Sequence, residues 1–142
     1  MNKESIYILE DRGIIYVSGN DVFSYLQNII SNDLTKVKDN QSCFSYLLTP
    51  QGKYLFEFII IKHKSGYFLD CPKYQIENLY KQLTLYKLRS KVDITNLSNE
   101  FVVAALTKDR FLEFENADNK TGMTIKFKED TVLLPRSPHK NS

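Results

Sequence analysis

The stretch that decides the fold runs from residue 42 to residue 61 and reads SCFSYLLTPQGKYLFEFIII. Two segments rich in aromatic and β-branched residues, Ser42 to Thr49 and Tyr54 to Ile61, flank Pro50-Gln51-Gly52-Lys53. Proline at the first corner of a tight turn and glycine two residues later supply the backbone dihedral angles that such a turn needs. The stretch therefore predicts two antiparallel strands joined by a tight turn.

One hairpin and one helix are expected before this stretch. Ser5 to Glu10 and Ile14 to Val17 predict a hairpin across Asp11-Arg12-Gly13. Ser18 to Asp21 supplies cap-forming residues, and the apolar spacing from Val22 to Ile30 predicts an amphipathic helix of about eleven residues.

A strand and a second helix are expected after it. Tyr67 to Cys71 predicts the strand, and Pro72 suits the first turn of a helix because its missing N–H needs no partner there. The apolar face of that helix consists of Ile76, Leu79, Tyr80, Leu83 and Tyr86. Shorter strands are expected at Val92–Thr95, Phe101–Leu106, Arg110–Phe114, Met123–Phe127 and Thr131–Leu134. The predicted fold class is α+β, one antiparallel sheet with two amphipathic helices on one face.

The composition is that of one globular domain. The chain has 142 residues, of which 42% are hydrophobic and 25% charged. We expect a single domain over residues 1–134 and a loose tail over 135–142. A net charge of +2 and a pI near 8.4 are too weakly basic for dedicated nucleic-acid binding. No apolar run approaches the ~20 residues of a membrane span, so neither a membrane nor a nucleic acid is an expected partner.

Several familiar kinds of site are absent from the sequence. It contains no phosphate loop, GxGxxG or CxxC motif, and its two histidines are too far apart to form a helix-borne metal pair. His63, between two lysines, is expected in solvent. Cys43 and Cys71 lie in apolar, strand-like stretches, and the N-terminus lacks the apolar stretch of a secretion signal. Reduced core cysteines and a cytoplasmic location are therefore predicted.

Glu57 interrupts an otherwise apolar strand. Alternation places it on one face with Leu55 and Ile59 and places Tyr54 and Phe56 on the other. Because both faces are apolar, the strand is expected to be central and covered on both sides. A carboxylate there must pair, hydrogen-bond or take a raised pKa. Two interpretations stay open: a strand-end side chain that reaches solvent or a lysine, and a carboxylate aimed into a ligand cavity.

A row of cations follows the second predicted helix. If this stretch is extended, Lys87, Arg89 and Lys91 share one side. Such a row either meets an anionic tail or phosphates, or simply forms a solvated face.

Three segments together resemble one known family. VSGNDVFSYLQN at residues 17–28, followed by SNDL at 31–34, is similar to the opening of folate-binding proteins related to the glycine-cleavage T-protein. LLTPQGK at 47–53 resembles that family's hairpin, and LYKLRSKV at 85–92 resembles a third family segment. Lys53 stands where aminomethyltransferases tend to carry a second glycine, which resembles the YgfZ-like branch. The chain thus resembles the N-terminal part of a longer family architecture.

The resemblance implies tetrahydrofolate as the cofactor. The family's folate-facing acid, usually aspartate, corresponds to Glu57. An aromatic residue that is tyrosine in the T-protein corresponds to Phe44, whose ring can stack on a pterin but offers no hydroxyl. Arg89 is a basic residue able to attract the glutamate tail of a folate. Asn32 and Asp33 match a corner that is expected to cap a turn.

The resemblance also implies a role in iron–sulfur cluster assembly or repair and in tRNA modification that depends on such clusters. Folate, iron–sulfur proteins and a separately encoded second half are the implied partners. The longer relatives carry a signature cysteine motif that this chain does not contain. The isolated chain is expected to lack catalytic activity, because half of the family's folate cavity is missing. Two alternatives stay open: a fragment of a tetrahydrofolate-dependent aminomethyltransferase, and a non-catalytic interaction module or degraded relic.

Overall fold

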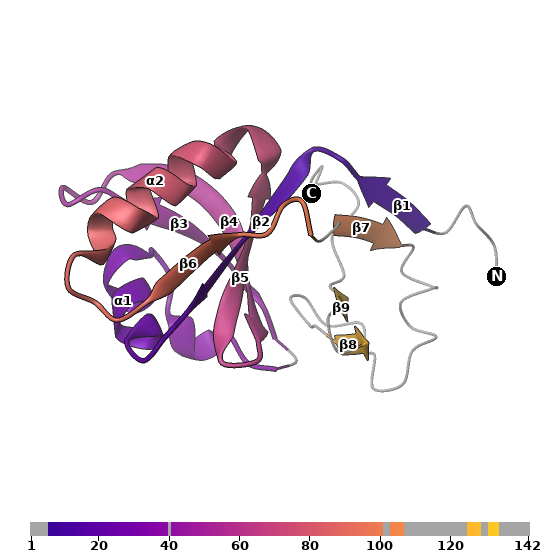
Figure 1. Ribbon diagram of the computed structural model, residues 1–142, viewed down its shortest axis with the longest axis horizontal. Helices are drawn as coiled ribbons and strands as arrows, with labels where there is room; N and C mark the ends of the chain where they lie inside the picture. Colours follow the sequence, from indigo (N-terminus) through magenta and orange to yellow (C-terminus); the bar gives the residue numbers. More distant parts are fainter. Residues whose placement is uncertain (1–5, 40, 101–102, 107–124, 129–130, 134–142) are drawn as a thin grey trace.

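A five-stranded antiparallel sheet forms the centre of the protein in a computed structural model that describes residues 6–39, 41–100, 103–106, 125–128 and 131–133 (Figure 1). The strand order is β3-β4-β5-β2-β6. The strands are β2 (Arg12–Ser18), β3 (Cys43–Leu48), β4 (Tyr54–His63), β5 (Gly66–Pro72) and β6 (Asp93–Asn96). Every pairing within this sheet is antiparallel, which confirms the α+β class and the predicted hairpin between β3 and β4.

Two helices, α1 (Val22–Ile29) and α2 (Ile76–Lys87), cover one face of the sheet (Figure 1). Short 3-10 turns, η2 (Leu34–Lys36) and η3 (Lys73–Gln75), follow α1 and precede α2. Apolar side chains of both helices pack on alternate residues of the strands. The fully buried members of this main core include Ile15, Leu26, Phe58, Ile60, Leu69, Leu79 and Leu83. The predicted pair of amphipathic helices on one face is confirmed.

The other face of the sheet holds a smaller core. Ile14, Ile61 and Phe68 are buried there, and the His63 ring stacks on Phe68 at a centroid distance of 4.5 Å. His63 is only 4% exposed, so the expectation that it lies in solvent is wrong. Cross-strand packing on Phe68, rather than the lysines beside it in the sequence, decides where the imidazole lies.

The predicted first hairpin is wrong. β1 (Ile6–Leu9) pairs with β7 (Val103–Leu106) and forms a separate two-stranded sheet. The reason is that β5 and β6 hydrogen-bond to the two edges of β2, which leaves no edge for β1. β8 (Ile125–Lys128) and β9 (Thr131–Leu133) pair with each other. The strand predicted at Arg110–Phe114 and the tail at 135–142 lie outside the described residues.

The helix starts also differ from the sequence expectation. Asp21 occupies the N-cap position of α1 but makes no side-chain capping bond. Its carboxylate instead accepts a hydrogen bond from the backbone N–H of Lys91 at 2.8 Å, which ties the start of α1 to the segment before β6. Pro72 ends β5 and occupies the N-cap position of η3, one residue before the first turn rather than within it. In the part of the chain that the structure describes, no helix is both long and apolar enough to span a membrane.

Candidate functional site

The β3–β4 hairpin brings two of the three predicted folate-binding residues to one face. In the antiparallel register, Tyr46 lies opposite Glu57 and Phe44 lies opposite Ile59. Opposite residues, and alternate residues along one strand, share a face of a sheet. Phe44, Tyr46 and Glu57 therefore project from the same side of the hairpin.

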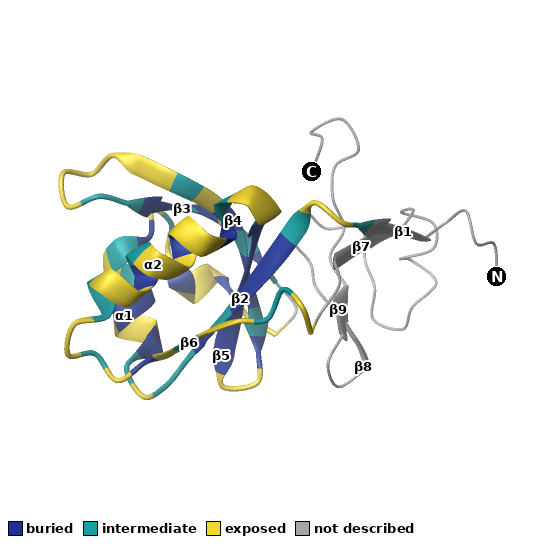
Figure 2. Ribbon diagram, turned by 45° about the horizontal axis from the view of Figure 1, so that its top comes forward, coloured by how far each residue is buried: buried dark blue, intermediate teal, exposed yellow. Residues whose placement is uncertain are grey.

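Glu57 is exposed, so the expectation of a strand covered on both faces at this position is wrong. The physical reason is that the pairing of β4 with β5 starts only at Ile59 and Asp70, so at Glu57 β4 is paired with β3 alone. Figure 2 shows the turn-side end of β4 as exposed and the rest of the strand as mostly buried. The carboxylate thus lies at the surface, beside aromatic rings and not within the core.

A β-bulge at Leu55 changes the face from which Tyr54 projects. Leu55 has no opposite residue, because the register shifts between Leu47 and Leu48. An extra residue in one strand reverses the alternation of the side chains beyond it. The Tyr54 ring stacks on Tyr46, with centroids 4.5 Å apart and planes 9° apart. Tyr54 therefore lies on the face of the carboxylate, and the opposite placement predicted from strict alternation is wrong.

We call the rings of Phe44, Tyr46 and Tyr54 the aromatic surface. Phe44 is 49% exposed and Tyr54 is 68% exposed. The Phe44 ring meets the Tyr46 ring edge-on, with centroids 5.1 Å apart. Adjoining exposed rings are typical of binding surfaces. Together with the carboxylate of Glu57, the aromatic surface can stack on a planar ligand and accept hydrogen bonds from its N–H groups.

The polar segment that follows α1, residues 31–35, hydrogen-bonds to the outer edge of β3. The backbone N–H of Ser31 donates to the Tyr46 carbonyl at 3.0 Å, and the Tyr46 N–H donates to the Ser31 hydroxyl at 3.0 Å. Asp33 accepts from the backbone N–H and the hydroxyl of Thr35, and these bonds lower the pKa of the Asp33 carboxyl. The capping role expected of Asn32 and Asp33 is confirmed.

Sequence reasoning missed two residues of this region. Gln27 ties this polar segment together, because its side-chain amide donates to the Asn32 carbonyl at 2.9 Å and its side-chain oxygen accepts from the Leu34 N–H at 2.7 Å. Gln27 lies in the family-like segment at residues 17–28, and this resemblance was the sequence signal that could have indicated its importance. Sequence reasoning also missed Tyr54 as a residue of this surface, because the bulge that places it on the face of Glu57 is visible only in the structure.

Arg89 lies in a different part of the molecule. The helix α2 ends at Lys87, and Leu88 then adopts a positive φ of 48°. The stretch is therefore not extended, so the condition under which the three cations would share one side is not met, and Arg89 and Lys91 are exposed. Arg89 borders a hollow of about 580 Å³ together with Asp21, Leu88 and Ser90.

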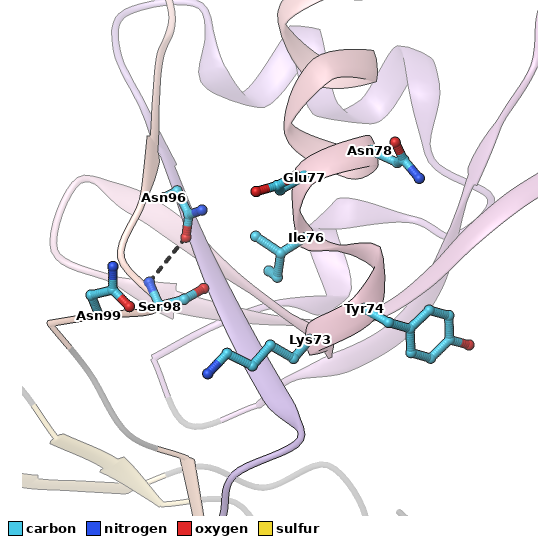
Figure 3. Close-up of a pocket in the computed structure, with 8 residues that line it drawn as sticks. All are labelled: Lys73, Tyr74, Ile76, Glu77, Asn78, Asn96, Ser98 and Asn99. Carbon is cyan, nitrogen blue, oxygen red and sulfur yellow. Dashed lines mark hydrogen bonds between the residues drawn. The ribbon is translucent and has the colours of Figure 1, made fainter.

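A second hollow, of about 420 Å³, lies where the start of α2 meets the end of β6 (Figure 3). It is lined by Lys73, Tyr74, Ile76, Glu77, Asn78, Asn96, Ser98 and Asn99. The Ser98 N–H donates to the Asn96 side-chain oxygen at 3.0 Å, within the segment that lines the side of the hollow across from α2 (Figure 3). None of the three predicted folate-binding residues lines this hollow.

The two cysteines are free thiols that act in packing. Burial raises the pKa of Cys43 to about 11 and the pKa of Cys71 to about 12. Only the thiolate is a good nucleophile or metal ligand, and these values keep both groups protonated near neutral pH. Among the described residues, no cluster of three or more His, Cys, Asp or Glu side chains could hold a metal ion.

Three groups of characterised proteins share sequence with this chain. An aminomethyltransferase of Thermoanaerobacter pseudethanolicus is 32% identical over 70% of the chain. An iron–sulfur cluster assembly factor IBA57 homolog of Dictyostelium discoideum is 28% identical over 73% of it. The tRNA-modifying protein YgfZ of Aliivibrio fischeri is 29% identical over 83% of it. The matched segment spans 27%, 32% and 36% of these relatives in turn, and no protein-family model matches the chain.

A solved structure shares the fold. The aminomethyltransferase T of the glycine cleavage system of Bartonella henselae superimposes with a TM-score of 0.59 at 18% identity. The shared fold covers 66% of this chain and 26% of that enzyme. In sequence relatives and in fold, the chain thus matches part of the length of a T-protein/YgfZ-like family protein.

Proposed function

We propose that the chain binds tetrahydrofolate on the exposed face of the β3–β4 hairpin. The observation that carries the proposal is that Glu57 and Phe44 project from the same accessible face. An ionised carboxylate is an acceptor-only group that forms strong hydrogen bonds with the N–H donors of a pterin. The Phe44 ring offers an apolar surface on which the pterin packs. Because Glu57 is exposed, the site is supported by the face that Glu57 shares with Phe44 and not by burial of the carboxylate.

Arg89 retains its predicted role of attracting the glutamate tail of the folate as a separate hypothesis. Arg89 borders the hollow together with Asp21, and the hairpin residues do not line that hollow. The hypothesis is tested by comparing tetrahydrofolate with its polyglutamylated form. If Arg89 attracts the tail, Arg89→Gln removes the advantage of the longer tail, whereas an unchanged advantage contradicts the hypothesis.

The biological role that we propose is that of a YgfZ-like protein in iron–sulfur cluster assembly or repair and dependent tRNA modification, in the cytoplasm. Two related proteins, an iron–sulfur cluster assembly factor and a tRNA-modifying protein, support this role. Lys53 after Gly52 supports the YgfZ-like branch. Iron–sulfur proteins, and a polypeptide that supplies the remaining family architecture, are the proposed partners. The chain alone is proposed to bind folate without catalysing a reaction.

Affinity measurements test the folate site. We expect calorimetric titration of the isolated chain with tetrahydrofolate to show weak binding, and Glu57→Gln to weaken it further by about tenfold or more, since a hydrogen bond to a charged group contributes roughly 1.5–3 kcal/mol. Glu77→Gln is the matched control, because Glu77 is also an exposed glutamate but lies on α2. Equal affinities of the Glu57 and Glu77 variants would remove Glu57 from the site.

A second candidate function is that of a piece of a tetrahydrofolate-dependent aminomethyltransferase. The 32% identity with the Thermoanaerobacter enzyme favours it. The two functions differ in what a gene deletion impairs. Loss of iron–sulfur-dependent tRNA modification supports the first function, and loss of glycine cleavage supports the second.

A further inference from the structure

The rings of Tyr46 and Tyr54 stack on each other outside both apolar cores of the sheet. Tyr54 is 68% exposed, yet its ring lies nearly parallel to the Tyr46 ring at 4.5 Å. Tyr46 in turn lies directly opposite Glu57. The pair therefore presents an aromatic face to solvent next to the carboxylate that the proposed function assigns to ligand binding.

The β-bulge at Leu55 places the Tyr54 side chain on this face. Without the bulge at Leu55, strand alternation would direct Tyr54 toward the helix-covered side together with Phe56. A bulge next to a binding site commonly serves to re-aim one side chain. The bulge thus converts a single aromatic contact at Phe44 into an extended surface that flanks the carboxylate.

We propose that the Tyr46–Tyr54 pair binds the second ring of a folate, the p-aminobenzoyl ring, while Glu57 and Phe44 bind the pterin. This inference rests on the proposed function and deepens it. Neighbouring residue pairs on one face of a hairpin are about 6.5–7 Å apart along the strands. A ligand with two ring systems joined by a short bridge can therefore place one ring at Glu57 and the other at Tyr54.

The charges at this surface favour such a ligand. Glu57 supplies only acceptor oxygens, so it selects a ring that carries N–H donors. The tyrosine rings offer flat aromatic faces, and such faces favour a second flat ring that stacks on them. A single-ring pterin would satisfy the carboxylate and leave Tyr54 without a ligand contact.

The test compares two ligands on the full chain by calorimetry or by ligand-detected NMR. Tetrahydrofolate has both ring systems, and 6-methyltetrahydropterin has the pterin alone. We expect Tyr54→Ala to reduce the affinity advantage of tetrahydrofolate over 6-methyltetrahydropterin by about threefold to tenfold, as an aromatic pair contributes roughly 0.5–1.5 kcal/mol. Tyr54→Phe keeps the ring and should retain most of the advantage. Tyr74→Ala, which removes an 82% exposed tyrosine outside the aromatic surface, is the control.

The outcomes separate this inference from the proposed function. If Glu57→Gln weakens tetrahydrofolate binding but Tyr54→Ala leaves the advantage unchanged, the tyrosine assignment is overturned and the folate site stands. If the wild-type chain binds neither ligand, the proposed function fails and the inference fails with it. If Tyr54→Ala alters only the oligomeric state seen by analytical ultracentrifugation, the surface is a contact between copies of the chain and the inference is wrong.

Discussion

The side-chain amide of Asn32 donates a hydrogen bond to the carbonyl of Phe44 at 2.9 Å. The side-chain oxygen of Asn32 accepts from the Asp33 N–H at 2.7 Å, so both ends of the amide are engaged. β3 is an edge strand, and its outer backbone groups would otherwise be open to pairing with another chain. Asn32 thus acts as a positioning residue for the strand that carries the candidate ligand-binding rings.

Asn32→Ala should destabilise the protein and loosen β3. We expect a loss of about 1 kcal/mol in the free energy of unfolding, the usual net contribution of one hydrogen bond. Urea unfolding measures that loss, and amide hydrogen exchange at Tyr46 reports the strand itself. Asn28→Ala is the control, since Asn28 is an exposed residue of α1. Equal exchange rates in the two variants would contradict a positioning role.

Gly19 and Gly52 provide a matched pair for backbone effects. Both have positive φ, 117° and 82°, but a Cβ at Gly19 would lie 2.4 Å from the Lys91 carbonyl oxygen, whereas none of the surrounding atoms lies within 4 Å at Gly52. Gly52→Ala should cost about 1–2 kcal/mol for the left-handed conformation alone. Gly19→Ala should cost clearly more, because the backbone must also move apart. Chemical denaturation of both variants tests this, and equal losses would show that the contact at Lys91 relaxes freely.

Leu26 should be among the most costly side chains to truncate. It is fully buried between α1 and the sheet, so Leu26→Ala removes apolar contacts and leaves a cavity. We expect a loss of about 2–5 kcal/mol in the free energy of unfolding. Phe23→Ala on the same helix removes a ring that is 44% exposed and should cost much less. The prediction is wrong if the two variants unfold at the same urea concentration.

The buried thiol of Cys71 should make the protein less stable at alkaline pH. Burial raises the pKa of Cys71 to about 12, compared with about 8.5 in an unfolded chain. A group whose pKa is raised by folding contributes stability that is fully present below its unfolded pKa and is lost as the pH rises through its folded pKa. The free energy of unfolding should therefore fall from about pH 8.5 upward. In urea unfolding at a series of pH values, Cys71→Ala should make the free energy of unfolding fall less steeply just above about pH 8.5. An unchanged pH dependence would contradict a contribution from Cys71.

Local sequence patterns predicted the elements well. The Pro50–Lys53 turn, most of each helix's apolar face and the α+β class follow from spacing within a few residues, and the structure confirms them. Tyr80, which was expected on the apolar face of α2, is 37% exposed. Non-local features were harder to predict. The partner of β1 is β7, nearly a hundred residues away, and a local hairpin signal pointed instead to β2.

In the candidate site, too, local features could be predicted from the sequence and non-local features could not. The family-like segments led to Phe44 and Glu57, and both lie on one face of the hairpin. The exposure of Glu57 depends on where the pairing between β4 and β5 stops, which no pattern around Glu57 encodes. The side on which Tyr54 lies depends on one bulge, and an alternation rule cannot predict the position at which the alternation itself breaks.

The most direct measurement is an amide NMR titration of the full chain with tetrahydrofolate. The account predicts that the shifted signals cluster at Phe44, Tyr46, Tyr54 and Glu57, and that Glu57→Gln weakens the response while Glu77→Gln does not. Shifts confined to the hollow beside α2 and β6, or a full response in the Glu57 variant, would contradict the assignment of folate binding to the β3–β4 hairpin.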